Sequence, residues 1–333
     1  MPINMGLNGQ ISLGEESTAG TAVATTVGTQ VTSVDIQEKL TIDAVDSLSG
    51  SGGTRNIIET IHSMTDVAGS ISLNAYYAGG ALGMLLKHAL GSVSTSGAGP
   101  YAHAYSLAAA LPNGLTVVVE RGNTGSDDKF AGCKISRMTI SCAAGEPMKI
   151  QVELIGMSAT ARTTFTPTAL TALASRFLVK HAHAGTLGFN SQTYRLKSFE
   201  LVIDNKLARQ DQLGSADSAE PVVTERQEIT VSATLVGTTN ALQLAHRSQT
   251  AGDVTLTFSD SPRSLAFTLH NGVITDYSDP IQGVGVIEQT VTWRGVGDDS
   301  DNGLAITLTN AILLRWPHEP AGPHRQGIGG AHP

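Results

Sequence analysis

Short stretches in which apolar and polar residues alternate recur along the chain and predict β-strands. Residues 31–37 give the clearest case, because Thr32, Val34 and Ile36 fall on one face of an extended chain. The opposite face carries Ser33, Asp35 and Gln37. Such a strand has one face toward a core and one toward water, so we expect it to be half buried.

The same alternation predicts many more strands and only two short helices. Strands are expected in the first half at 69–77, 102–107, 115–120, 133–142 and 149–155, and in the second half at 195–205, 228–236, 253–258, 265–273, 284–293 and 304–308. Apolar residues at helical spacing predict helices over 81–90 and 240–247. The sequence therefore predicts a mainly β protein.

These phrases occur twice in the same order. Ser70–Ala75 resembles Thr230–Leu235, and each is followed by one of the two helices. The other matching pairs are Ser33–Ile36 with Ser198–Leu201, Leu115–Val119 with Leu265–Leu269, and Val152–Gly156 with Val291–Gly295. A unit of this length is a domain, so the repeat predicts two related β-sandwich or barrel domains in tandem.

Changes in composition give the expected boundaries. We predict an N-terminal arm over 1–28, a first domain over 29–158, a linker over 159–192, a second domain over 193–312 and a flexible tail over 313–333.

One long polar loop follows the first strand of each half, at 41–66 and at 206–226. Loops of this length are usually functional or disordered, and their presence at the same point of both copies favours a function. The first loop has Ser49-Gly-Ser-Gly-Gly53 at its tip, flanked by residues able to form an extended hairpin.

Catalytic chemistry is not indicated. The sequence contains no phosphate-binding loop, nucleophile elbow, His-Glu-x-x-His or paired Cys-x-x-Cys motif, so we expect neither an enzyme nor a cofactor. His181 and His183 lack a nearby third ligand, and Asp298, Ser300 and Asn302 lack the carboxylate that completes a calcium loop, so no metal site is expected.

Composition limits the partners and the compartment. The net charge of −8 argues against a surface that grips nucleic-acid phosphates. No apolar run is long enough to span a membrane, and the N-terminus does not have the pattern of a secretory signal. The two cysteines, Cys133 and Cys142, are expected to be reduced and buried.

The chain resembles the tail tube proteins, also called major tail proteins, of long-tailed bacteriophages. The resemblance rests on the order of strand, long loop, strand, helix and hairpins in each half, and on the phrase from Gly14 to Thr21 near the start. In that family, subunits join their sheets into a ring with a β-barrel lumen, and the rings stack into a tube that carries the genome. The resemblance implies the same role here, in the virion tail, after assembly in the cytoplasm of the host bacterium.

The duplication adds an expectation about symmetry, because three chains would supply the six domains of a ring that is usually hexameric. The implied partners are other copies of the chain, the tape-measure protein, the tail terminator and distal tail proteins, and viral DNA that passes without specific binding. Candidate ring-stacking residues are Asp43, Asp46, Arg55, Glu59, Arg209, Asp211, Asp217 and Glu220. Candidate lumen-lining residues are Ser33, Asp35, Gln37, Ser198, Glu200 and Asp204.

Two other interpretations remain open at this point. The tube could belong to a phage-derived particle, such as a gene-transfer agent or an injection system. The chain could instead be a two-domain β-sandwich adhesin or binding module, although that class would be expected to carry a secretion signal and exposed aromatic residues.

Overall fold

The computed structural model describes residues 9–45, 57, 59–78, 80–122, 127–163, 165–166, 168–170, 172, 175–237, 239–281, 284, 286–297 and 303–311. The chain is mainly β, and the two predicted helices are present as α1 (Ala81–Leu90) and α2 (Asn240–Ser248). The alternation of apolar and polar residues therefore predicted the fold class correctly.

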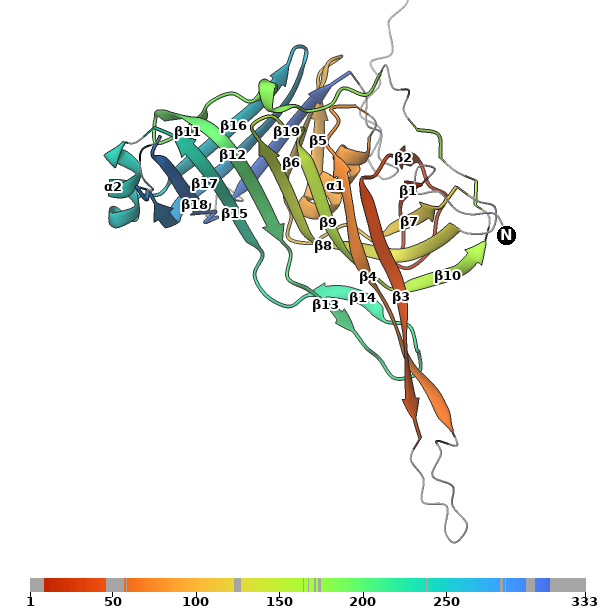
Figure 1. Ribbon diagram of the computed structural model, residues 1–333. Coiled ribbons are helices and arrows are strands. Elements are labelled where there is room, and N and C mark those ends of the chain that lie inside the picture. Colours follow the sequence, from red (N-terminus) through yellow and green to blue (C-terminus); the bar gives the residue numbers. More distant parts are fainter. Residues whose placement is uncertain are drawn as a thin grey trace, which may run out of the picture.

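The strands form one connected 17-stranded sheet and a separate two-stranded one. Eight strands of the large sheet make one antiparallel layer, called the eight-stranded sheet, which runs through both halves of the chain (Figure 1). Its order is β3 (Ser33–Ala44), β4 (Thr60–Asn74), β9 (Lys149–Gly156), β8 (Asp127–Ala143), β12 (Gln192–Asp204), β15 (Glu228–Val236), β18 (Glu288–Arg294) and β17 (Arg263–Ser278). The first four strands come from the first half and the last four from the second. The two halves are thus joined edge to edge where β8 pairs with β12.

A second layer of strands covers one face of this sheet, because β8 and β17 are long enough to enter two sheets. The N-terminal part of β8 pairs with β7 (Leu115–Glu120) and β10 (Ser158–Thr163), and β1 (Gln10–Glu15) and β2 (Val27–Thr29) continue from β7. The N-terminal part of β17 pairs with β16 (Gly252–Asp260) and β19 (Leu304–Asn310), and β11 (Leu187–Phe189) pairs with β16.

The halves also meet in this second layer. The hairpin of β5 (Gly91–Ser96) and β6 (Tyr101–Leu107) belongs to the first half, but β6 pairs with β19 of the second. The predicted linker contains β10, β11 and the short 3-10 helix η3 (His181–His183), and its residue Val179 is fully buried. The two halves therefore share contacts in both layers.

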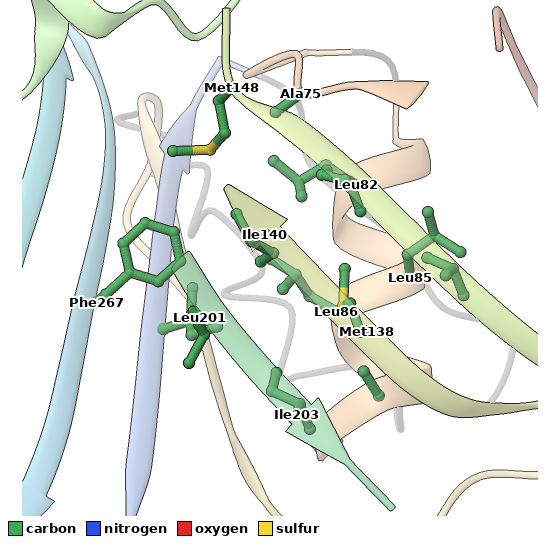
Figure 2. Packing of buried hydrophobic residues seen from close by; sticks show 14 of the residues in the cluster. Ala75, Leu82, Leu85, Leu86, Met138, Ile140, Met148, Leu201, Ile203 and Phe267 are labelled. Atoms are coloured by element: carbon green, nitrogen blue, oxygen red, sulfur yellow. The ribbon is translucent and has the colours of Figure 1, made fainter. Parts of the chain in front are cut away.

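A single hydrophobic core crosses the boundary between the halves. Figure 2 shows Leu82, Leu85 and Leu86 of α1 beside Met138 and Ile140 of β8, with Leu201 and Ile203 of β12 next to them. Helix α1 begins after Gly80 and stops at Gly91, two glycines with positive φ that a side chain would strain. Burial on nearly every side explains why this helix is almost entirely apolar.

β-Bulges at corresponding places in β8 and β17 show which residues of the two halves are equivalent. Gly132 in β8 and Asn271 in β17 both have positive φ where the pairing with the preceding strand shifts. A second shift follows Ile135 in β8 and Ile274 in β17. These bulges make Ile135 equivalent to Ile274.

Following the pairings across the sheet extends the equivalence from one strand to the next. Leu154 becomes equivalent to Trp293, Gly69 to Val231, and Ile36 to Leu201. The predicted matches of Ser33–Ile36 and of Val152–Gly156 are confirmed, and the match of Ser70–Ala75 is displaced by two residues. The match of Leu115–Val119 with Leu265–Leu269 is wrong, because the counterpart of β7 is β16, which pairs with β17 as β7 pairs with β8.

Candidate assembly surfaces

The second face of the eight-stranded sheet is polar. On β12, Phe199, Leu201 and Ile203 point into the core, whereas Glu200 is exposed between them. Neighbouring strands place hydroxyl and amide side chains on the same face, including Ser70, Ser72, Thr139, Ser141, Gln151, Ser232 and Thr292. Alternation along each strand therefore separates a buried apolar face from a hydrated one.

All six candidate lumen residues lie on this polar face. Ser33, Asp35 and Gln37 are exposed on β3, and the amide of Gln37 donates a hydrogen bond of 2.7 Å to the Asp35 carboxylate. The other three, Ser198, Glu200 and Asp204, alternate with the core residues of β12. The structure thus brings the two sets onto one surface, while their position in a lumen stays a prediction.

Basic side chains neutralise several carboxylates on or beside this face. Lys206 Nζ lies 2.8 Å from Asp204 Oδ2, Lys197 Nζ lies 2.6 Å from Glu288 Oε1, and Arg294 pairs with Glu228. Burial alone would raise the pKa of Asp204, but the hydrogen bond and charge of Lys206 outweigh it and hold that pKa below its ordinary value. The polar face is therefore of mixed charge, and among the described residues Asp35 and Glu200 form no salt bridge with a basic side chain.

The eight-stranded sheet ends in two edges. Within the described residues, β3 pairs only with β4, and residues 273–278 of β17 pair only with β18. Figure 1 shows β3 at one lateral end of the sheet and β17 with β18 toward the other. An uncovered edge offers a row of backbone donors and acceptors to another strand.

The first long loop is the end of a hairpin that projects from the sheet. β3 continues to Ala44 and β4 starts at Thr60, so the predicted loop 41–66 contains paired strand at both ends (Figure 1). We call residues 40–45 and 59–61 of this hairpin the arm. Its side chains of Leu40, Ile42 and Ile61 are 50%, 62% and 49% exposed. Asp43 and Glu59 lie exposed on the arm, and Asp46 and Arg55 fall outside the described residues.

The second long loop folds back onto the first half. Its hairpin consists of β13 (Leu207–Gln210) and β14 (Ala219–Val223). Arg209 lies 3.4 Å from Asp66 and 2.6 Å from Asp211, and the Thr65 amide donates a hydrogen bond of 2.8 Å to the Ala216 carbonyl, next to Asp217. Lys134 Nζ is 2.5 Å from Glu220 Oε1. We call residues 206–226 the brace, since it supports the base of the arm.

The phrase Gly14–Thr21 has a structural explanation. The carboxylate of Glu16 is only 1% exposed and accepts hydrogen bonds from the Gly132 amide at 2.9 Å, the Thr116 hydroxyl at 2.8 Å and the Gly20 amide at 2.8 Å. Three donors satisfy a buried charge that would otherwise be costly. Glu16 therefore ties the N-terminal segment to the bulge of β8.

Two absences apply to the described part of the chain alone. No three His, Cys, Asp or Glu side chains there lie close enough together to hold a metal ion. No helix among the described residues is both long and apolar enough to cross a bilayer. The residues of the calcium-like phrase, Asp298, Ser300 and Asn302, fall outside the described residues.

Sequence reasoning missed charged residues where β8 meets β12 and at the two edges of the sheet. Arg137 of β8 stands opposite Asp204 of β12, and the equivalent positions in the repeat are Asp276 and Lys39. Lys39 was overlooked because the predicted strand ended at Gln37. The signal that could have found it is the alternation itself, which continues through Leu40 and Ile42.

The fold and these surfaces define a β-sheet protein whose specialised features are two open edges, a polar face and a projecting arm. The family model of the phage tail tube proteins matches residues 6–295, and the chain belongs to this family. It is thus a structural protein of the phage tail, and the family points to a non-enzymatic role. No curated protein matches the sequence.

Proposed function

We propose that three copies of this chain close into a ring, that the eight-stranded sheets line its lumen, and that stacked rings form the tube through which viral DNA leaves. The observation that carries this proposal is the junction of β8 and β12. There, two copies of one unit already sit side by side in one continuous sheet, as neighbouring subunits would in a ring.

Duplication sets the number of chains. If each half fills one of six positions, three chains complete the ring, and its lumen would be a closed barrel that leaves no sheet edge exposed to water. Contacts between the edges of different chains would be heterologous, and a heterologous contact closes into a ring when its rotation fits.

The polar face suits a lumen for DNA. It carries hydroxyl and amide groups, and two of its basic side chains, Lys206 and Arg294, are engaged by carboxylates. Two others, Arg137 and Lys39, stand opposite Asp204 and Asp66. DNA phosphates would therefore meet little uncompensated positive charge, which is the requirement for passage without binding. The candidate residues Ser33, Asp35, Gln37, Ser198, Glu200 and Asp204 would line this path.

We further propose that the arm is the main ring-stacking element. The arm projects from the rest of the sheet (Figure 1), and its apolar side chains are exposed, so a neighbouring ring could bury them. Asp43 and Glu59 would lie in that contact. The brace would contribute through its tip, where Leu213 is fully exposed, while Arg209, Asp217 and Glu220 hold it to its own chain.

A virion-tail location follows from the family. We also propose that the tube assembles in the cytoplasm of the host. It would contact the tape-measure protein, which would set its length, and the terminator and distal tail proteins, which would lie at its two ends.

Electron microscopy of the purified chain tests the proposal. We expect tubes with a regular axial repeat and an open lumen, and a ring mass of three chains after mild dissociation. A protein that stays monomeric at high concentration, or rings of six chains, would contradict it.

A further inference from the structure

We call the pairing of β8 with β12 the internal joint. If the chain forms the proposed ring, this joint is a template for the contact between subunits, so the inference rests on the proposed function. The bulges make β17 equivalent to β8, and the sheet pairings make β3 equivalent to β12. β3 and β17 are also the two edges of the sheet within the described residues. We infer that residues 276–281 of one subunit pair with residues 34–39 of the next, in the register that joins β8 to β12.

The register makes specific residues neighbours. In the internal joint, Phe199 stands opposite Cys142 and Asp204 opposite Arg137. The equivalent pairs between subunits are Val34 with Ile281 and Lys39 with Asp276. Each pair thus joins one residue near the end of β17 to one residue of the neighbour's β3.

Burial supports the apolar pair. Cys142 is 8% exposed and Phe199 is 4% exposed where β8 meets β12, and the ring of Phe199 also packs against Phe258 and Phe267 of the second layer. Ile281 occupies the position of Cys142 but is 77% exposed. Val34, in the position of Phe199, is only half-buried. Ile281 lies at an open edge that a strand of a neighbouring subunit would cover, and Val34 of that neighbour has the matching position and chemistry.

Charge supports the other pair and also explains specificity. Arg137 and Asp204 attract each other across the internal joint, and the charge of Arg137 is one of the causes that lower the pKa of Asp204. At the open edges the polarity is reversed, with Asp276 on β17 and Lys39 on β3, so the two equivalent positions again carry opposite charges.

This reversal disfavours the wrong pairings. If β3 were to pair with β8, Lys39 would face Arg137, and if β12 were to pair with β17, Asp204 would face Asp276. Like charges opposite each other in a sheet are destabilising, so the two joints cannot exchange strands without a penalty. The charges therefore favour a ring in which first and second halves alternate.

Disulfide trapping tests the register. The double variant Val34→Cys/Ile281→Cys should form disulfide-linked dimers and trimers under mild oxidation, because directly opposite residues in a sheet bring their Cβ atoms within bonding range. Each single variant is a control, and Lys39→Cys/Ile281→Cys is an out-of-register control. The native Cys133 and Cys142 are buried and should not interfere.

Charge exchange tests the ion pair. Lys39→Asp and Asp276→Lys should each raise the protein concentration needed for assembly about tenfold, and the double exchange should return it to within about twofold of wild type. Lys149→Asp makes the same charge change on an interior strand of the polar face, at a side chain that is 56% exposed, and should have little effect.

Failure of the two hypotheses can be told apart. If the wild-type chain forms tubes but the Val34/Ile281 pair does not cross-link and the double exchange does not rescue assembly, the register is wrong and the ring stands. If the wild-type chain does not assemble at all, the proposed function itself fails.

Discussion

Arg209 of the second half reaches Asp66 at the base of the arm in the first half, with 3.4 Å between Nη1 and Oδ1. The contact links the two long loops that occupy the same place in the two halves of the repeat. The two loops have diverged, since one projects from the sheet and the other supports it.

The Arg209–Asp66 contact should be weak but measurable. Both side chains are partly exposed, so a double-mutant cycle of Arg209→Ala and Asp66→Ala should give a coupling free energy of about 0.2 to 1 kcal/mol in chemical denaturation. Asp211 also pairs with Arg209, and a parallel cycle with Asp211→Ala separates the two contributions. A coupling of zero with Asp66 would show that the brace is held by its other contacts, such as Lys134–Glu220 and the backbone hydrogen bond between Thr65 and Ala216.

Loss of apolar surface on the arm should impair stacking and leave folding intact. Leu40→Ser/Ile42→Ser removes two side chains that are already at least half exposed, so the free energy of unfolding should change by less than about 1 kcal/mol. Tube formation should be lost while rings persist, as seen by sedimentation and electron microscopy. Leu244→Ser on α2, 55% exposed in the wild type, is the matched control and should form normal tubes.

Removing the carboxylate of Glu16 should destabilise the fold strongly. Glu16→Ala leaves the buried amide of Gly132 and the hydroxyl of Thr116 without their acceptor, at a cost of about 1 to 3 kcal/mol for each buried group. We expect a loss of about 3 kcal/mol in denaturant unfolding. Glu146→Ala removes an exposed carboxylate paired with Lys149 and should cost well under about 1 kcal/mol. Equal effects of the two variants would contradict the assigned role of Glu16.

His88 should make the fold sensitive to acid. Burial lowers its pKa to about 3, and the positive charges of Lys87 and Lys134 add to this effect, although Glu15 Oε1 lies 3.8 Å from its Nε2. Between the ordinary pKa of 6.5 and about 3, the unfolded chain binds a proton that the native chain does not bind. The stabilisation is therefore complete above that range and declines as the pH falls, by up to about 1.4 kcal/mol per pH unit.

The matching experiment compares His88→Gln with the wild type. The variant lacks the titrating group, so its deficit in free energy of unfolding should shrink as the pH is lowered from about 7 to about 4. A deficit that stays constant over this range would show that His88 does not titrate on unfolding.

The fold class was predictable because its cause is local. Alternation in Ser33–Gln37 and in the strand around Leu201 follows from one buried and one hydrated face, and the spacing of Leu82, Leu85 and Leu86 follows from the helical period. The same local signals placed all six candidate lumen residues on one face of the sheet.

The contacts between the two halves were not predictable, because strand partners are set by residues distant in sequence. Nothing near Asp204 indicates that Arg137 will stand opposite, and nothing near Arg209 indicates that the brace will fold back onto Asp66. The bulges at Gly132 and Asn271, which fix the register of the repeat, depend on backbone conformation at single residues and are hidden among other glycine and asparagine positions.

A cryo-EM reconstruction of the assembled tube would test the central claim most directly. The account predicts a ring of three chains with pseudo-sixfold symmetry, in which β17 of each chain lies beside β3 of the next and the face carrying Glu200 lines the lumen. A tube whose lumen is formed by the other layer of strands, or whose subunits meet through surfaces other than β3 and β17, would contradict it.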